Sequence, residues 1–302
     1  MGSLLIGKKS LSNPYAAGGN AYKIQPHCHS TSSDGERTPA EVMAAYKALG
    51  YDAVFLTDHV ALNSDPEVAG IQWFQGCEYE CKDEAEAVQA HINGWFCESV
   101  EGFGPPDPVG ITTLLALMKL QPMLIGLNHP TAAGQTYNIT MPDELDQMAN
   151  DIGFIEVYNG GFVVQCDDKW SYCLDTKTGP VWGIASDDSH LADGSQDNKG
   201  WIVLYAPSLT AANVKAALQA GNFYATGGAA ITSIVVSGHT VTITLPDAGS
   251  VYWVVTGNKI VQTTTGITSA SYTVQPKDKW ARAIIYRNSN GKYAWTQPFF
   301  VE

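Results

Sequence analysis

Strand-like runs alternate with helical segments through the first two thirds of the chain. Strands are predicted at residues 22–25, 52–56, 123–127 and 181–185. The last three are almost continuously apolar, which is typical of parallel strands that are buried on both faces. Strands that alternate with helices predict an α/β fold class with a largely parallel sheet.

The helical segments carry clear end signals. Thr38 and Glu41 form a capping box, Pro39 takes the first helical position, and we expect this helix to end at Gly50. Further helices are predicted at residues 111–120, 142–149 and 211–220.

The pattern changes near Gly227 and Gly228 to short alternating runs rich in Thr, Val and Tyr. This change predicts a small antiparallel β subdomain, resembling a sandwich. The predicted runs cover residues 231–236, 241–245, 251–256, 271–274, 281–286 and 293–300. The domain prediction is therefore an arm at 1–20 lying on the larger unit, a catalytic unit at 21–228 and a β appendage at 229–302.

Six of the seven histidines lie in short clusters with carboxylates at the ends of predicted strands. Imidazole and carboxylate together form a transition-metal ligand set. His27 and His29 are two residues apart, so they project from one face of an extended strand, and Asp188 and His190 can do the same. Ligands at the carboxyl ends of successive strands are typical of an α/β barrel. The sequence thus predicts a multinuclear metal centre.

The ordered series His-x-His, Ser-Asp-Gly, Thr-Asp-His, Gly-x-Glu, His, Asn-His-Pro and Asp-x-His resembles the PHP (polymerase and histidinol phosphatase) superfamily of metal-dependent phosphoesterases. The resemblance covers residues 21–228 and implies a distorted (β/α)7 barrel with two or three metal ions. It implies two ligand sets that share Glu78 as a bridge, namely His27, His29, Glu78 and Asp188, and Glu78, His91 and His129; a third set is Asp34, His59 and His190. Asp34 stands where some members of the family have a histidine.

At some positions two residues compete for one role in the predicted metal site. Glu80 competes with Glu78, and the Gly-x-Glu pattern favours Glu78. Asp187 competes with Asp188, and the spacing to His190 favours Asp188. Asp58 is predicted to orient a neighbouring imidazole rather than to bind metal. The seventh histidine, His239, is predicted to be an exposed turn residue.

The chain has 17 basic and 30 acidic residues and a formal net charge of −13. This charge argues against nonspecific binding of large nucleic acids, which depends on basic surface. Divalent ions would nevertheless make the filled site locally positive and suited to a small phosphorylated substrate or phosphate. Arg37 is a candidate to grip that phosphate at the mouth of the site. Lys23 and Lys199 are further candidates.

The six cysteines include no CxxC pair, so we expect free buried thiols. No stretch is long enough to span a membrane, and the apolar patch near the start is too short for a signal-peptide core. These features predict a cytoplasmic protein that does not bind membranes.

The predicted chemistry is hydrolysis of a small phosphate ester, a monoester or a diester, by a hydroxide that bridges two metal ions. Bound water ionises near pH ~7 instead of about 15.7. Mixed nitrogen and oxygen ligands admit Mn, Fe or Zn. His190 or a metal-bound water would protonate the leaving group. The alternatives are an amide or other non-phosphate hydrolase at the same site, and a noncatalytic protein that the metals stabilise.

Overall fold

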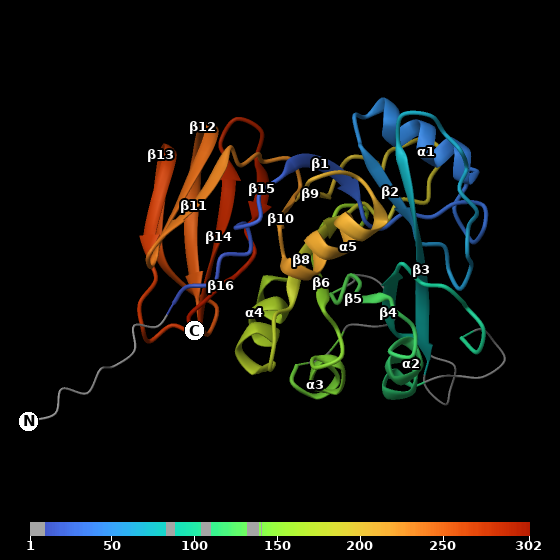
Figure 1. Ribbon diagram of the computed structural model, residues 1–302, viewed down its shortest axis with the longest axis horizontal. Helices are drawn as coiled ribbons and strands as arrows, with labels where there is room; N and C mark the ends of the chain where they lie inside the picture. Colours follow the sequence, from blue (N-terminus) through green and yellow to red (C-terminus); the bar gives the residue numbers. More distant parts are fainter. Residues whose placement is uncertain (1–9, 83–87, 104–109, 132–138, 140) are drawn as a thin grey trace, which may run out of the picture.

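The computed structural model describes residues 10–82, 88–103, 110–131, 139 and 141–302. The described residues form a mixed α/β structure with one continuous 16-stranded sheet (Figure 1). The sheet runs in the order β11-β12-β14-β15-β10-β9-β1-β2-β3-β4-β5-β6-β7. Outside this order, β13 pairs with β12, β16 pairs with β14 and β8 pairs with β6. The α/β fold class is confirmed.

The larger part of the chain contains five helices and ten strands among the described residues. The strands are β1 (Asn20–Gln25), β2 (Ala53–Leu56), β3 (Gln72–Lys82), β4 (Val88–Trp95), β5 (Leu124–Leu127), β6 (Phe154–Asn159), β7 (Val164–Gln165), β8 (Trp182–Ser186), β9 (Trp201–Ala206) and β10 (Phe223–Thr226). The helices are α1 (Pro39–Ala48), α2 (Ile111–Met118), α3 (Asp143–Met148), α4 (Asp167–Thr176) and α5 (Ala211–Ala220).

The strand pairing differs from the expected seven-stranded parallel barrel. The β1–β2, β2–β3, β5–β6 and β6–β8 pairs are parallel, whereas β1–β9, β9–β10, β3–β4 and β4–β5 are antiparallel. In the described residues no ladder joins β8 to β1 or β9, and only an isolated bridge links Cys28 to Ser189. The sheet is therefore not closed, and the (β/α)7 barrel is not confirmed.

The helix ends follow their sequence signals. At α1 the Thr38 hydroxyl accepts a hydrogen bond from the backbone N–H of Glu41, whose carboxylate accepts from the backbone N–H of Thr38. This pair satisfies two backbone donors that the first helical turn leaves open. At the end of α5, Gly221 adopts a left-handed conformation with φ of 69°, which glycine reaches without steric cost.

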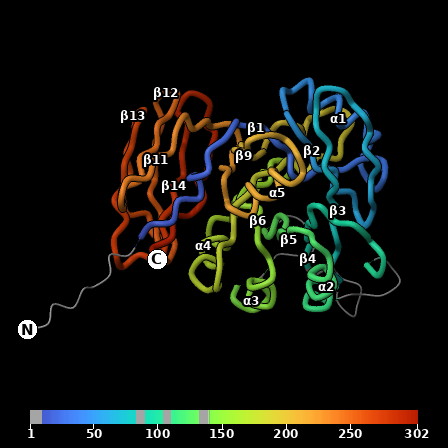
Figure 2. The backbone as a smooth tube through the Cα atoms, in the orientation of Figure 1, coloured from blue at the N-terminus to red at the C-terminus, as the bar shows by residue number. Residues whose placement is uncertain are grey.

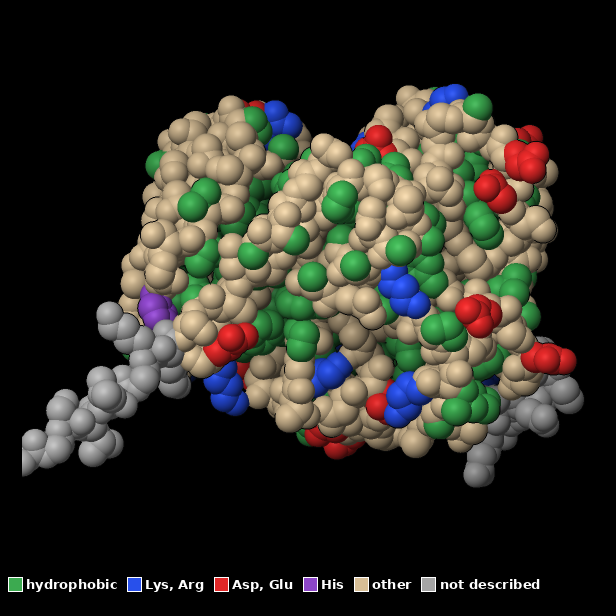
Figure 3. Space-filling model, in the orientation of Figure 1, with side chains coloured by type: hydrophobic (Ala, Val, Ile, Leu, Met, Phe, Trp, Pro, Cys, Tyr) green, Lys and Arg blue, Asp and Glu red, His purple; other side chains and the backbone are tan. Residues whose placement is uncertain are grey.

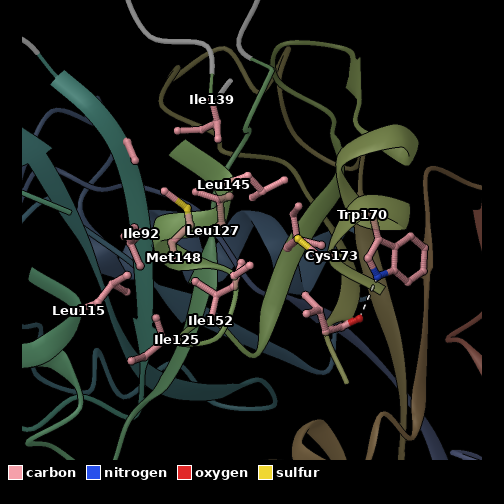
Figure 4. Close-up of a cluster of buried hydrophobic side chains, with 14 of the residues drawn as sticks. Ile92, Leu115, Ile125, Leu127, Ile139, Leu145, Met148, Ile152, Trp170 and Cys173 are labelled. Carbon is pink, nitrogen blue, oxygen red and sulfur yellow. Dashed lines mark hydrogen bonds between the residues drawn. The ribbon is translucent and has the colours of Figure 1, made fainter. Parts of the chain in front are cut away.

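The largest apolar core lies between the sheet and helices α2, α3 and α4. Figure 4 shows side chains from these elements converging there, among them Ile92, Leu115, Leu145 and Trp170. The indole N–H of Trp170 donates to the carbonyl of Val181 at 2.8 Å, so this fully buried ring leaves no donor unpaired. All six cysteines are free and buried, which confirms that prediction.

The C-terminal part is antiparallel throughout, as predicted. Its strands are β11 (Ser233–Ser237), β12 (Thr240–Val255), β13 (Lys259–Thr273), β14 (Trp280–Arg287), β15 (Lys292–Trp295) and β16 (Phe299–Phe300). Two of the predicted runs merge into the long β12. The β15 strand pairs with β10, so the sheet continues from one part into the other. The boundary at residues 228 and 229 stays a prediction.

The described part of the N-terminal arm lies mainly along the C-terminal end of the chain. The backbone N–H of Ser10 donates to the carbonyl of Glu302, and that of Ser12 donates to the carbonyl of Phe300. Tyr15 packs into the core of the β appendage. Figure 2 shows this arm running beside the C-terminus. The described arm also contacts the larger unit, through the ring pair of Tyr15 and Tyr205 and the hydrogen bond from Asn222 Nδ2 to the Gly18 carbonyl. The arm at residues 1–20 stays a prediction.

Candidate metal centre

The structure brings all nine predicted ligand residues into one cluster. His27 and His29 follow β1, His59 follows β2, His129 follows β5, and the Asp188–His190 pair follows β8. Glu78 and His91 lie within the paired strands β3 and β4. Asp34 lies in the turn after β1, beside His29 and His190. Six of the nine side chains therefore follow the carboxyl ends of strands, as the motif order predicts, and the other three come from β3, β4 and the turn after β1.

Glu78 is the centre of the cluster. Its carboxylate is 1% exposed, and five imidazoles face its two oxygens. The Oε2 atom lies 3.3 Å from His27 Nε2, 3.1 Å from His29 Nε2 and 3.5 Å from His59 Nε2. The Oε1 atom lies 3.2 Å from His91 Nδ1 and 3.3 Å from His129 Nε2. Each oxygen thus faces its own group of histidines.

Asp188 is a second buried carboxylate at this centre. Its Oδ1 atom lies 3.2 Å from His27 Nε2 and 3.3 Å from His29 Nε2, and its Oδ2 atom lies 3.6 Å from His129 Nε2. The residue has a φ of 51°, and His129 has a φ of 22°. Left-handed conformations of residues other than glycine are costly and concentrate at functional sites.

A third group lies nearer to solvent. The Asp34 carboxylate is 55% exposed and lies 3.5 Å from His190 Nε2 and 3.7 Å from His59 Nε2. Both imidazoles are about one fifth exposed, at 21% for His59 and 22% for His190. This side of the cluster is therefore the one that a solute can approach.

The spacing of the donor atoms fits metal ions. Ligand atoms that bind one ion at about 2.1 Å lie roughly 3.0–3.4 Å apart in octahedral or tetrahedral geometry. The contacts among His27, His29, Glu78 and Asp188 fall between 3.1 and 3.3 Å, including 3.1 Å between the two Nε2 atoms. Two imidazole nitrogens that face each other suit a shared cation.

Three groups of side chains could hold an ion, with one donor atom from each residue within 4.8 Å of the others. They are His27, His29, Glu78 and Asp188; His29, Asp34, His59 and His190; and His59, Glu78 and His91. The first agrees with an implied ligand set, and the second adds His29 to another. The third contains His59 where the resemblance implies His129, although His129 contacts the same Glu78 oxygen as His91.

Mutual attraction shifts the pKa values of the metal-free cluster. Burial opposes ionisation of Glu78, yet His27, His91 and His59 hold its pKa well below the usual range. Burial likewise disfavours the charged imidazoles, yet the neighbouring carboxylates raise the pKa of His29 to about 9 and that of His91 to about 10. Metal ions would displace these protons, because a ligating imidazole must give up the proton on its donor nitrogen.

Glu156 on β6 holds two members of the cluster by hydrogen bonds, and this role was not predicted from the sequence. Its Oε1 atom accepts from His27 Nδ1 at 2.7 Å and from the Ser186 hydroxyl at 2.5 Å. Its Oε2 atom accepts from the backbone N–H of His129 at 2.7 Å and from Asn159 Nδ2 at 3.0 Å. A carboxylate behind a ligating histidine fixes the ring and its tautomer. The sequence signal that could have identified Glu156 is an acidic residue among the apolar residues of β6.

Two amides also hold carboxylates of the cluster, and neither was predicted from the sequence. Asn128 donates to Glu78 Oε1 at 2.6 Å, and Asn159 donates to Asp188 Oδ2 at 3.1 Å. Both amides are buried. They orient the carboxylates without adding charge.

Asp58 differs from its prediction. It does not contact an imidazole in the described hydrogen bonds but accepts from the backbone N–H and hydroxyl of Ser30, the Ser33 hydroxyl and the Asn63 amide, all at 2.7 Å. Asp58 therefore anchors the loop that carries Asp34, and the expectation of an imidazole partner is corrected.

Arg37 also differs from its prediction. Its guanidinium makes a bidentate ion pair with Asp197, at 2.6 and 2.7 Å, and donates to the Ser189 hydroxyl at 3.1 Å. The side chain is 10% exposed. Because an internal carboxylate occupies both arms of the fork, the expected phosphate grip at the mouth of the site is corrected to an internal ion pair.

The remaining candidates lie outside the cluster or at its rim. Glu80 lies 3.7 Å from His91 Nε2 and pairs with Lys82 at 2.8 Å, so Glu78 alone holds the central position. Asp187 accepts from three backbone N–H groups at 198–200 and from a tyrosine hydroxyl. Lys23 donates to Asn198 at 2.7 Å. The others are Lys199, whose backbone N–H donates to Asp187, and His239, which is half-buried in the β11–β12 turn.

No family model and no curated protein matches the sequence. Among solved structures, a two-domain protein from Bacteroides vulgatus that contains a predicted PHP-like metal-dependent phosphoesterase aligns with a TM-score of 0.57. That alignment covers 92% of this chain and 93% of that chain at 17% identity. Among the described residues, no helix is long and apolar enough to cross a membrane.

Two further structures align less closely. The lesion-specific endonuclease PfuEndoQ from Pyrococcus furiosus has a TM-score of 0.48 at 16% identity over 66% of this chain and 56% of that chain. An amidohydrolase from Chromobacterium violaceum has a TM-score of 0.43 at 16% identity over 56% of this chain and 88% of that chain. From the match over 92% of the chain we conclude that this protein shares the fold of the Bacteroides vulgatus two-domain structure, which agrees at the level of fold with the resemblance inferred from the ordered motifs.

Proposed function

We propose that this protein hydrolyses a small phosphate ester at a site of two or three divalent metal ions. The observation that carries the proposal is the Glu78 carboxylate, whose two oxygens face separate groups of histidines. A carboxylate placed in this way can bridge two ions. Two ions at bridging distance are the arrangement that phosphoesterases use to hold both sides of a displaced phosphoryl group.

The proposed ligand sets follow the clusters. His27, His29, Glu78 and Asp188 would hold one ion, and Glu78, His91 and His129 a second. Asp34, His59 and His190 would hold a third. Mn, Fe and Zn all accept this mixture of nitrogen and oxygen donors. When bound, such ions supply Lewis acidity and lower the pKa of water to about 7.

The protein's own residues fix the donors and leave one side open. Glu156 orients His27 and holds the backbone at His129, so these ligands need no rearrangement to bind. His190 Nδ1 lies 2.9 Å from the carbonyl oxygen of Asp188. If the Nδ1–H group donates a hydrogen bond to this oxygen, the neutral ring keeps a lone pair on Nε2. The neutral ring is therefore arranged as a ligand, and proton donation by His190 requires the imidazolium.

A small anionic substrate agrees with the charges. Three divalent ions outweigh the three ligand carboxylates, so a filled site is locally positive although the chain carries a net charge of −13. The acidic surface disfavours long polyanions. The partly exposed group of Asp34, His59 and His190 gives a phosphate group its route to the ions.

The test is product release by metal-loaded protein from a phosphomonoester, a phosphodiester and an anilide of similar size. Mn²⁺, Fe²⁺ and Zn²⁺ are loaded separately, and bound metal is counted by mass spectrometry. Glu78→Gln and His129→Ala test the centre. The matched control is His239→Ala, because His239 lies in the distant β11–β12 turn.

We expect release from at least one phosphate ester by the wild type and by His239→Ala, and little or none by the two centre variants. The better ester would identify the substrate class. Cleavage of the anilide alone would overturn the proposal in favour of an amide hydrolase. Full metal occupancy without cleavage of any substrate would favour a noncatalytic role for the ions.

A further inference from the structure

A cavity away from the metal cluster lies at the junction of the N-terminal arm, the larger part of the chain and the β appendage. Its volume is about 460 Å³, within the range of about 300–1,000 Å³ that is typical of small-molecule sites. None of its lining residues belongs to the metal cluster. The cavity lies at the start of β8, at Trp182, whereas Asp188 follows the end of the same strand.

Apolar side chains form one wall of this junction pocket. Trp182, Phe300 and Leu174 line it, and the two aromatic rings meet edge to face with centroids 6.3 Å apart. The indole N–H of Trp182 donates to the carbonyl of Gln219 at 3.1 Å, so its polar atom is already satisfied. The face drawn in Figure 3 shows hydrophobic side chains across its middle, with Lys and Arg side chains among and below them.

Two lysines line the same pocket. Lys279 Nζ donates to the carbonyl of Asp175 at 3.0 Å, and Lys177 Nζ donates to the carbonyl of Ile152. Within the part of the chain that the structure describes, neither ammonium forms a salt bridge with a carboxylate. Burial lowers the pKa of Lys177 to about 8, and the Asp151 carboxylate offsets this effect only in part.

The acidic side chains of the pocket already have hydrogen-bond donors other than the two lysines. Both oxygens of Asp175 accept hydrogen bonds from the appendage, Oδ1 from the Trp280 indole and Oδ2 from the Gly257 backbone N–H, each at 2.8 Å. Glu302 is exposed, and its Oε2 atom faces the Ser10 hydroxyl at 3.4 Å. Each of the two lysine ammonium groups donates to one carbonyl oxygen and keeps further N–H donors that a ligand can use.

We propose that the junction pocket binds a small amphipathic carboxylate. The apolar body of this ligand would lie against Trp182, Phe300 and Leu174, and its carboxylate would accept from Lys177 and Lys279. Lys177 is half-buried and Lys279 is exposed. Charge-assisted hydrogen bonds to an ammonium group are stronger than neutral ones, so an anion is the favoured ligand class. This site is independent of hydrolysis at the metal centre.

The probe is 2-naphthoate, titrated calorimetrically into the metal-loaded full chain, with 2-naphthylmethanol as its neutral match. We expect the carboxylate to bind at least tenfold more tightly, since a hydrogen bond to a charged group contributes roughly this factor or more. Metal-free protein should bind the probe with the same affinity as metal-loaded protein, because no lining residue belongs to the metal cluster. Equal affinity for the alcohol, or loss of binding on removal of the metal, would overturn the proposal.

Variants locate the probe. Gly179 lines the pocket, and a Cβ built on it meets no atom within 4 Å, so Gly179→Phe fills the cavity and should abolish binding. Lys177→Met and Lys279→Met should each weaken binding, whereas Lys277→Met, a nearby exposed lysine outside the pocket, should not. Glu302→Gln removes a repelling charge and should strengthen binding.

Unchanged affinity in folded Gly179→Phe, or equal effects of Lys277→Met and Lys279→Met, would refute the site. If Gly179→Phe fails to fold, the lysine variants decide. The outcome does not depend on whether the metal centre cleaves phosphate esters, because binding is measured directly.

Discussion

Replacing Glu156 with glutamine tests whether the buried carboxylate beneath the metal cluster tunes metal affinity. Each Glu156 oxygen accepts two hydrogen bonds, from His27 and Ser186 on one side and from His129 and Asn159 on the other. Glutamine has nearly the same shape but presents an NH₂ group to one of these pairs. In either orientation two donors then face a donor, which leaves buried hydrogens unsatisfied.

The expected loss in metal affinity is 10- to 100-fold, about 1.4–2.7 kcal/mol, which is the usual effect of removing a carboxylate behind a ligating histidine. The unpaired donors should also lower the free energy of unfolding by about 1–3 kcal/mol. Neither effect requires a change in the ligand residues themselves.

The assay is competition between the protein and a chelator for Zn²⁺ and Mn²⁺, at a temperature where the wild type and the variant are both folded by circular dichroism. Urea unfolding of the metal-free proteins measures the stability effect separately. Asp247→Asn is the control, because Asp247 pairs with Arg287 in the appendage. Metal affinity of Glu156→Gln within threefold of the wild type would refute the assigned role of Glu156.

Two further outcomes follow from the charges around the site. Removing Asp197 leaves the Arg37 guanidinium buried and uncompensated, so Asp197→Ala should lower the free energy of unfolding by about 3–5 kcal/mol in urea titrations, and a loss below 1 kcal/mol would contradict a buried ion pair. In metal-free protein the raised pKa values of His29 and His91 stabilise the fold fully below about pH 6.5, and this stabilisation is lost as pH rises through about 9 and about 10. Metal binding strengthens over the same range, so the gap in Tm between metal-loaded and metal-free protein should widen from pH 6.5 to 9.5; a constant gap would count against proton displacement.

The side chains that form the cluster could be predicted because each one follows a local signal; their role as metal ligands stays a prediction. His27 and His29 alternate on an extended segment, and Asp188 and His190 follow an apolar run that the structure places in β8. Helix α1 was likewise predictable from its capping box. Local signals of this kind do not depend on how distant strands pair.

The features that were not predicted are the pairing of strands distant in the sequence and the hydrogen-bond partners of residues around the cluster. The antiparallel pairing of β3 with β4 and the open edge of the sheet depend on contacts between distant segments, which a hydrophobic pattern does not encode. The partners of Asp58 and Arg37 were mispredicted for the same reason, since Ser30 and Asp197 are distant from them in the sequence and meet them only in the folded chain. Glu156 is the exception, because its charge inside an apolar strand was visible.

The ladder between β10 and β15 makes the two parts of the chain one folding unit in a practical sense. Trp280 and Trp295 from the appendage belong to the same core as Trp170. A chain cut after residue 228 would lose both indoles from that core and leave β10 with a row of unpaired backbone N–H and C=O groups. Such an edge recruits strands from other molecules. The appendage therefore covers a sheet edge of the part that contains the histidine and carboxylate cluster, and a chain cut after residue 228 should self-associate more than the full chain.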